Sequence, residues 1–470
     1  MKLYNTLSGK KESLKKPANR ALKLFVCGPT VYDYSHIGHA RTYIFFDILV
    51  RYLRYLGLKI FYLQNITNID DKIINRANRE KKNISAISRF FEKEYYRDMK
   101  TLGVESVDCY AKAGDFIKEI QRQIQTLVKK GFAYKTKNGV YFEVKKFKNF
   151  GKLSRQNLNA LRPGWRIEPD PEKKDPLDFA LWKFSEQKPY WPSLWGNGRP
   201  GWHIEDTAIT KKIFGSQYNL HGGGNDLKFP HHEAEIAQAE SASGKKPFVK
   251  IWLHTGFLLV NGEKMSKSLG NFITIKDFLK KFPPEILRMI VLGRHYQSPL
   301  DYNEAIAENA KNSITAIKEF LGKLELVKKW KMENVPPLRD PAVAVRKWKT
   351  RVKIKKYEKD FQTALENNFN TPEAIAVIFK LINDYQKNIW QLNKKGAAEI
   401  ADFIKEKLEI FGFKLKKEKI PVKIAALAKK REELREFKQF IQADRLRKTI
   451  QRLGYIIEDT PIGSLIIKLK

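Results

Sequence analysis

The first hydrophobic pattern in the chain is a short apolar run, a long segment with helical periodicity and a second short run. Residues 22–28 (LKLFVCG) form the first run, and residues 59–67 (KIFYLQNIT) form the second. Between them, residues 40–57 (ARTYIFFDILVRYLRYLG) place apolar side chains at helical spacing and end at a glycine. Strand, helix and strand make a βαβ unit, so the pattern predicts an α/β fold with a Rossmann-like parallel sheet. A ligand site is expected at the carboxyl ends of its strands.

The next part of the chain is less regular and predicts an insertion between two halves of the sheet domain, at about residues 110–200. It contains a helical pattern near 115–130 and a hairpin pattern over 132–144 (FAYKTKNGVYFEV), with Asn138-Gly139 as the turn. Residues 247–262 (PFVKIWLHTGFLLVNG) then return to strand-like apolar runs.

The remainder of the chain is Lys-rich and predicts long helices. Residues 335–341 (VPPLRDP) are typical of a linker, and residues 429–454 predict one helix that precedes a short extended end. A chain of 470 residues is too long for a single core. We therefore expect a sheet domain over residues 1–305 that includes the insertion, a helical domain over 306–412 and a small domain over 413–470.

The charge balance narrows the class of partner. The chain has 89 Lys and Arg against 52 Asp and Glu, a net charge of +37, which favours a polyanion. Nucleic acid is the first candidate and an anionic membrane surface is the second, while solvated Lys-rich faces remain a simpler explanation. No apolar run approaches the roughly 18 residues of a membrane helix, and the N-terminus lacks the apolar core of a signal peptide. With only two cysteines, Cys27 and Cys109, these features predict a protein of the reducing cytoplasm.

Two short motifs carry candidate chemistry, and the first is His-Ile-Gly-His in residues 26–42 (VCGPTVYDYSHIGHART). A turn that joins a strand to a helix N-terminus favours anions. Imidazole N–H groups of His36 and His39 could donate to phosphate oxygens, and Gly38 would let a ligand approach the backbone. The motif suits a nucleoside triphosphate, although two ordinary turn histidines would give the same sequence pattern.

The second motif is NGEKMSKSLGN, residues 261–271. Lys264 and Lys267 lie in a polar loop between two glycines, and Thr274 with Asp277 predicts the cap of the next helix. Such a loop could close over a leaving pyrophosphate, or it could be a solvated basic loop.

Together these motifs resemble the HIGH and KMSKS signatures of class I aminoacyl-tRNA synthetases, and more narrowly those of the cysteinyl-tRNA synthetases. The resemblance extends to residues 199–209 (RPGWHIEDTAI), 221–240 (HGGGNDLKFPHHEAEIAQAE), 361–379 (FQTALENNFNTPEAIAVIF) and 443–461 (ADRLRKTIQRLGYIIEDTP). It implies a Rossmann-like catalytic domain with a connective insertion, followed by a helical region that reads the tRNA anticodon. It also implies a monomer that uses Mg-ATP to join cysteine to its tRNA through a cysteinyl-adenylate.

The resemblance implies one zinc ion per chain in the amino-acid pocket. Serine is nearly isosteric with cysteine, and a soft metal prefers sulfur strongly, so a metal can discriminate where shape cannot. The family's ligands correspond to Cys27, His231 and Glu235, and to Asp206 at a position where the family has a cysteine. His231 and Glu235 are four residues apart, which would place both on one helix face.

The resemblance also implies the remaining site residues. His36, His39, Lys264 and Lys267 of the loop 264–268 would be catalytic, and Thr67 and Trp202 would bind the amino acid. The nucleotide would be bound by Gly38, His221, Gly222, Gly223, Asp226 and Lys267. Two alternatives share the catalytic domain: a ligase that joins cysteine to a small amino sugar, and a tRNA-binding relative without activity. The basic C-terminal part disfavours the first, and the intact signatures disfavour the second.

Overall fold

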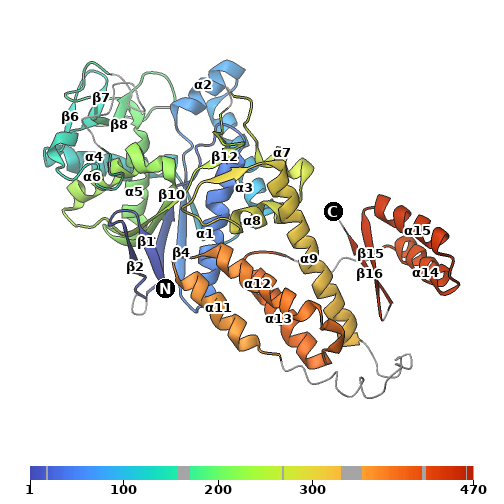
Figure 1. Cartoon of the computed structure of the whole chain (residues 1–470). Coiled ribbons are helices and arrows are strands. Elements are labelled where there is room, and N and C mark those ends of the chain that lie inside the picture. Colours follow the sequence, from blue (N-terminus) through green and yellow to red (C-terminus); the bar gives the residue numbers. More distant parts are fainter. Residues whose placement is uncertain are drawn as a thin grey trace. The chain divides into compact units, whose positions relative to one another are not determined.

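The structure is a computed structural model that describes residues 1–16, 20–156, 170–266, 269–329, 352–414, 420–461 and 463–468. The chain forms two compact units (Figure 1). The first comprises Met1–Leu279, His295–Tyr302 and Glu366–Phe369, and the second comprises Lys280–Arg294, Asn303–Leu365 and Asn370–Lys470.

A five-stranded parallel sheet organises the first unit, as predicted. Its strand order is β11-β10-β3-β4-β5, and every neighbouring pair is parallel. The strands are β3 (Leu22–Val26), β4 (Ile60–Ile66), β5 (Cys109–Lys112), β10 (Tyr218–Gly224) and β11 (Val249–Thr255). The expected helix α1 (Ile37–Tyr55) connects β3 to β4 and confirms the βαβ unit. It is buried along most of its length, which agrees with its apolar residues on several faces.

Two helices follow β4 before the chain returns to the sheet as β5. They are α2 (Asp71–Glu80) and α3 (Ile84–Thr101). At the N-terminus of the chain, β1 (Lys2–Asn5) pairs with β2 (Lys10–Ser13) as a small antiparallel ribbon. The side chain of Asn5 joins this ribbon to β11 by accepting a hydrogen bond from Trp252 N.

The insertion between β5 and β10 contains the predicted helix and hairpin. Helix α4 (Ile117–Lys129) precedes β6 (Ala133–Lys135) and β7 (Gly139–Phe142), which pair antiparallel around Asn138-Gly139. With β8 (Phe179–Phe184) and β9 (Gly198–Pro200) they form a four-stranded sheet. Helix α5 (Trp202–Phe214), before β10, carries Asp206 of the predicted metal set, and α6 (Glu233–Ser243), after β10, carries Glu235.

After β11 the chain forms a small sheet and then becomes helical. The small sheet contains β12 (Leu258–Val260), β13 (Glu263–Lys264) and β14 (Leu300–Tyr302), with α7 (Ile275–Lys281) between β13 and β14. The first helices of the second unit among the described residues are α8 (Pro284–Leu292), α9 (Glu304–Lys329), α11 (Ile354–Glu366), α12 (Thr371–Gln386) and α13 (Lys394–Ile410). The predicted linker 335–341 lies outside the described residues.

The prediction of one helix over residues 429–454 is wrong. The segment forms two helices, α14 (Val422–Glu436) and α15 (Phe440–Arg452). They are separated by Lys438, whose φ is 57°. Gln439 N donates to Leu434 O and Lys438 N donates to Arg435 O, which is the hydrogen-bond pattern of a Schellman helix end. Because a lysine takes the position that glycine usually occupies, the sequence carries no stop signal there.

The extended end of the chain is a hairpin of β15 (Tyr455–Thr460) and β16 (Gly463–Lys468), which pair antiparallel. Among the described residues, no helix has both the length and the apolar character needed to cross a membrane.

Candidate active site and metal centre

His36 and His39 form the N-terminal cap of α1. The Nδ1 atom of His36 accepts from Gly38 N at 3.1 Å and from His39 N at 3.3 Å, and His39 Nδ1 accepts from His36 N at 3.3 Å. This is a capping box in which two imidazoles replace the usual hydroxyl and carboxylate. A backbone N–H can only donate, so both Nδ1 atoms must be unprotonated. Each neutral ring therefore carries its proton on Nε2, the nitrogen opposite the cap.

The His39 imidazole is held in its neutral form. Burial, and then the positive charge of Lys72, lowers the pKa of His39 to about 4. The rings of His36 and His39 stack with their centroids 3.7 Å apart. Gly38 leaves space for this stack, because a Cβ at that position would lie 2.8 Å from the His36 ring. The turn thus presents two neutral N–H donors rather than two charges.

The loop that contains Lys264 ends against the same turn. Ile37 N donates to Ile273 O at 3.1 Å, and Ile275 N donates to Ser35 O at 2.8 Å. Thr274 accepts from Asp277 N at 3.0 Å, which confirms the predicted helix cap. The turn that carries the first signature motif is therefore joined by backbone hydrogen bonds to the segment that directly follows the second. Lys267 lies outside the described residues.

A cleft of about 350 Å³ opens at the carboxyl ends of the sheet strands, as expected for this fold. Several predicted residues line it: Cys27, His36, Gly38, His39, Trp202, Asp226 and Lys264. Thr67 does not. It is 1% exposed and donates to Glu205 Oε2 at 3.0 Å.

The glycine run after His221 is placed differently from a nucleotide-binding loop. His221 has no exposed surface, and its ring stacks on Trp252 with the centroids 4.1 Å apart. A Cβ on Gly222 would lie 2.1 Å from the Phe46 ring, so packing against α1 is sufficient reason for a glycine there. Only Gly224 and Asp226 of residues 221–226 line the cleft. Nucleotide contacts by His221, Gly222 and Gly223 stay predictions.

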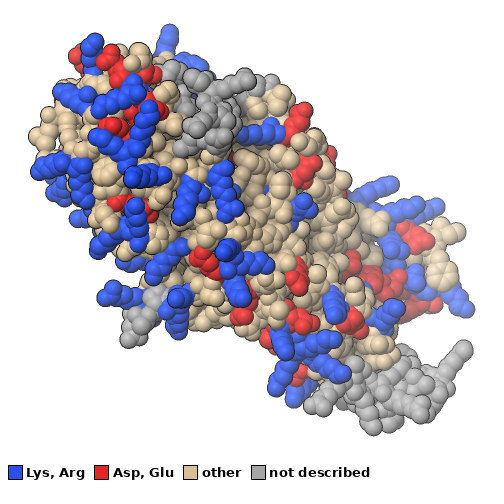
Figure 2. All heavy atoms as spheres, turned by 60° about the vertical axis from the view of Figure 1, so that its left-hand side comes forward, with Lys and Arg blue, Asp and Glu red and all other residues tan. Residues whose placement is uncertain are grey.

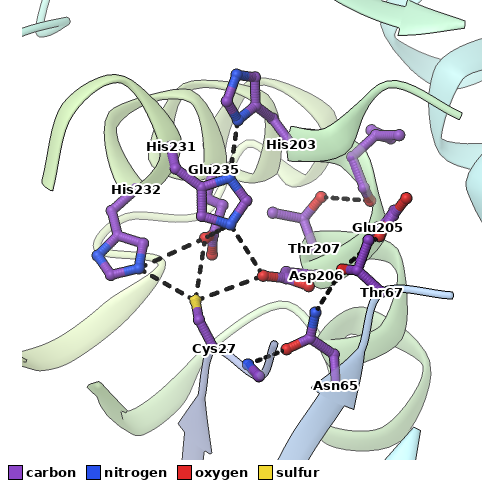
Figure 3. A network of polar contacts seen from close by, with 12 residues as sticks. Cys27, Asn65, Thr67, His203, Glu205, Asp206, Thr207, His231, His232 and Glu235 are labelled. Atoms are coloured by element: carbon purple, nitrogen blue, oxygen red, sulfur yellow. Dashed lines mark hydrogen bonds and ion pairs between the residues drawn. The ribbon is translucent and has the colours of Figure 1, made fainter. Parts of the chain in front are cut away.

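The four predicted metal ligands converge on one point beside the cleft (Figure 3). Cys27 Sγ lies 3.4 Å from Asp206 Oδ2 and 3.8 Å from Glu235 Oε1. His231 Nε2 lies 3.1 Å from Asp206 Oδ2 and 3.2 Å from Glu235 Oε1. For metal–ligand bonds of about 2.0–2.3 Å, the corners of a tetrahedron lie about 3.3–3.8 Å apart. The two distances from Cys27 Sγ lie in this range, and the two from His231 Nε2 are slightly shorter, so the spacing of these atoms is close to that around a tetrahedral ion.

The chemistry of the cluster fits a cation as well. Asp206 Oδ1 and Glu235 Oε2 are buried and accept no hydrogen bond. In the described part of the chain, the ion-pair partners of these two carboxylates are histidines only. Burial raises the pKa of the Cys27 thiol, and the charges of Glu235 and Asp206 raise it further. Buried carboxylates without a permanent cation are costly, and a metal ion would compensate them.

Further histidines surround the cluster. His232 Nε2 and His221 Nε2 lie 3.1 Å and 3.4 Å from Cys27 Sγ, so that His221, His232, Cys27 and Glu235 form a second possible ligand set. The Nδ1 atoms of the cluster histidines contact outer groups: His203 at 2.8 Å for His231, His254 at 2.8 Å for His232 and the Tyr218 hydroxyl at 2.7 Å for His221. Such outer contacts fix the orientation of a ligand ring.

Four further residues of the site have no predicted role: His203, Glu205, His232 and His254. The sequence does carry one signal for His232. It is adjacent to His231, and the predicted ligand set uses only one of these two histidines. His203 and His254 carry no local signal, since their partners are brought near by the fold.

Comparisons with known proteins identify relatives along the whole chain. Residues 13–312 match the family model "tRNA synthetases class I (C) catalytic domain", and residues 360–416 match the DALR domain. The cysteine--tRNA ligase of Thermococcus gammatolerans is 41% identical over 485 residues, covering 100% of this chain and 99% of the relative. That of Methanococcus maripaludis is 44% identical over 484 residues, with the same coverage.

The fold also resembles solved class I structures. A Mycobacterium tuberculosis methionyl-tRNA synthetase in complex with methionyl-adenylate has a TM-score of 0.59 at 15% identity, covering 83% of this chain and 89% of that one. At this identity the likeness concerns the fold alone. The full-length identity to the two ligases and the family match over residues 13–312 show more: the chain belongs to the cysteine--tRNA ligases of the class I tRNA synthetase family.

Proposed function

We propose that this protein attaches cysteine to its tRNA at the expense of ATP. The observation that carries the proposal is the cleft itself, in which two imidazole N–H donors stand beside a buried Cys, His, Asp and Glu cluster. In the first step a cysteine carboxylate oxygen attacks the α-phosphorus of Mg-ATP. The bond from that phosphorus to the β-phosphate oxygen breaks, and its electron pair leaves with pyrophosphate. A ribose hydroxyl of the tRNA's terminal adenosine then takes the cysteinyl group and releases AMP.

The chain's own residues supply positioning and charge stabilisation. His36 and His39 donate their Nε2–H groups to oxygens of the α-phosphate, where negative charge builds in the transition state. Lys264 holds the departing pyrophosphate together with Lys267. Trp202 covers the amino-acid side of the cleft, since its ring stacks on His231 with the centroids 4.1 Å apart.

The metal centre is proposed to hold one zinc ion through Cys27, Asp206, His231 and Glu235. When bound, the ion supplies a soft Lewis acid that favours a thiolate over the hydroxyl of serine. An aspartate is an accepted zinc ligand and carries the same charge as the thiolate it replaces. His203 holds the His231 ring so that Nε2 faces the other donors, which is the orientation a ligand needs.

The acceptor is proposed to be the tRNA for cysteine, bound through its phosphates. Lys and Arg side chains are spread over the face shown in Figure 2, in keeping with the net charge of +37. The domain bounds 306–412 and 413–470, and their contact with the anticodon, belong to this proposal. The proposal also includes a monomeric state and a location in the cytoplasm, where the tRNA is used. An amino-sugar acceptor is not favoured, because the relatives matched along their whole length are tRNA ligases.

An amino-acid panel tests the function. Purified protein is assayed for ATP–pyrophosphate exchange with each of the standard amino acids, and then for charging of a cysteine tRNA transcript. Cysteine alone should support exchange, and serine should not. Exchange with another amino acid, or cysteine activation without transfer to any tRNA, would contradict the proposal.

A further inference from the structure

In the segment Asp70-Asp71-Lys72, the lysine lines the cleft and the two aspartates do not. Asp70 caps α2, because its Oδ1 accepts from Lys72 N at 2.8 Å. Asp71 contacts the insertion through ion pairs with Arg199 and with Lys183, the latter at 3.0 Å. Neither carboxylate is among the residues that line the cleft. Both acids are thus engaged in structure, and the lysine that follows them is the residue that reaches the site.

Lys72 lines the cleft together with His36 and His39. Its ammonium lies over the ring of Tyr32, 5.6 Å from the centroid, and Tyr32 is also a cleft residue. In the described part of the chain Lys72 forms no ion pair with a carboxylate, in contrast to Lys183 and Arg199 beside it. Its charge acts on the nearby Asp70 carboxylate without forming an ion pair, so this cation, held over a ring, can still accept an anion from a ligand.

The order of the sheet strands places this cation on a defined side of the cleft. Lys264 lies on the chain that leaves β11, and Lys72 lies on the chain that leaves β4. The His36–His39 turn follows β3, which stands between them in the order β11-β10-β3-β4. An anion at the two imidazoles would therefore have Lys264 on one side and Lys72 on the other.

The imidazoles themselves create a need for this charge. Because the His39 ring is neutral, it can donate a hydrogen bond but cannot balance a negative charge. Joining a carboxylate to an α-phosphate brings two anions together, away from the side where pyrophosphate leaves. A lysine on the β4 side offsets the repulsion between them, and the loop that holds Lys264 is on the other side.

We propose, on the basis of the cysteine activation inferred above, that the Lys72 ammonium contacts the oxyanions at the junction of the cysteine carboxylate and the α-phosphate of ATP. It stabilises the charge there while the adenylate forms. Lys72 is then a catalytic residue of the first step, alongside His36 and His39.

The test compares Lys72→Met, which keeps an unbranched apolar stem beside Tyr32, with Lys72→Arg, which keeps the charge. Arg79→Met is the matched control, because Arg79 is exposed on the same helix, does not line the cleft and carries the same charge. Pyrophosphate exchange is measured against ATP and cysteine concentration, and transfer from preformed cysteinyl-adenylate to tRNA is measured in a single turnover.

Lys72→Met should lower kcat/KM for exchange by about 100-fold, the typical cost of one lost transition-state contact. Lys72→Arg should recover most of the exchange rate. Arg79→Met should exchange at nearly the wild-type rate. The thermal unfolding midpoints of all three variants should stay near that of the wild type. A rise in the KM for ATP assigns the contact to the phosphate, and a rise in the KM for cysteine assigns it to the carboxylate.

Three results would overturn the assignment. They are exchange by Lys72→Met within about threefold of wild type, an equal loss in Arg79→Met, and a loss confined to transfer, which would mean a tRNA phosphate contact. If wild type showed no cysteine-dependent exchange, the proposed function would fail first. Lys72→Met would then be judged on the amino acid that the panel identifies.

Discussion

The histidines at the start of α1 and those around Cys27 use the same ring in opposite ways. At the helix start, Nδ1 accepts backbone hydrogen bonds, so the proton is on Nε2, and both rings line the cleft. Around Cys27, Nδ1 of each ring faces an outer group and Nε2 faces the sulfur or the carboxylates. Those rings can present a lone pair instead of a proton. What stands behind a histidine therefore decides whether its Nε2 offers a proton or a lone pair.

The largest expected effect comes from removing the Cys27 thiol, which the histidines of the cluster surround. Cys27→Ala should lose the bound metal, from about one ion per chain to a small fraction, because the site loses its only thiolate, the soft donor that favours zinc, and keeps one imidazole and two carboxylates. Cysteine-dependent exchange should fall by about 1000-fold or more, the range for loss of a group that orients substrate. Metal analysis after chelator-free purification checks this.

Cys109→Ala is the matched control for that experiment. Cys109 is the only other cysteine, lies on β5 and belongs to neither possible ligand set. It should keep both metal and activity. Metal retained at the wild-type level by Cys27→Ala would show that the cluster binds it without the thiolate.

The second effect separates the cap from the donor at the start of α1. His36→Asn keeps an acceptor for the N-terminal amides but removes the Nε2–H, so stability should change by less than about 1 kcal/mol. The rate of adenylate formation should fall by about 100-fold. Pre-steady-state adenylate formation and thermal unfolding measure the two quantities. An Asn variant as fast as wild type would mean that the ring serves only the helix.

A smaller effect is expected from restoring a second thiolate. Asp206→Cys should slow the loss of metal to a chelator by about 10-fold, within the range seen when the surroundings of a metal are altered. It should also widen the preference for cysteine over serine, because the softer ion favours sulfur more strongly. Metal release is followed with a colorimetric chelator. Faster release from the Cys variant would contradict Asp206 as a ligand.

The smallest effect concerns His39, which should stay neutral at a pH where an ordinary histidine becomes protonated. The pKa of His39 is lowered to about 4, below the value near 6.5 of an unfolded chain. The folded state thus resists protonation, and the stability that this ring contributes is present above pH 6.5 and declines as the pH falls from 6.5 towards 4. NMR of ¹³C-labelled histidine, with His39→Asn to assign the signal, should find His39 neutral at pH 5.5. A midpoint near 6.5 would contradict the neutral donor.

Local patterns predicted the parts of this molecule that depend on local forces. The β3-α1-β4 unit follows from apolar periodicity, and the cap at Thr274 follows from a short spacing. The break at Lys438 could not be read, because the signal there would have been a glycine. The histidines that surround the predicted metal ligands could not be predicted either. His203, His232 and His254 acquire their roles from contacts that only the folded sheet creates, and the placement of Lys72 likewise depends on where β4 ends.

The capping box at the start of α1 also limits how this enzyme can change under selection. In an ordinary helix the capping residue can be exchanged among serine, threonine, asparagine and aspartate at little cost. Here the nitrogens that accept from the backbone belong to rings whose opposite nitrogens are, in the proposed function, the donors to the α-phosphate. A substitution that improves the cap removes a donor. Heat tolerance and turnover are therefore inherited together at this turn, and a lineage adapting to a hotter habitat would have to gain its stability elsewhere in the chain.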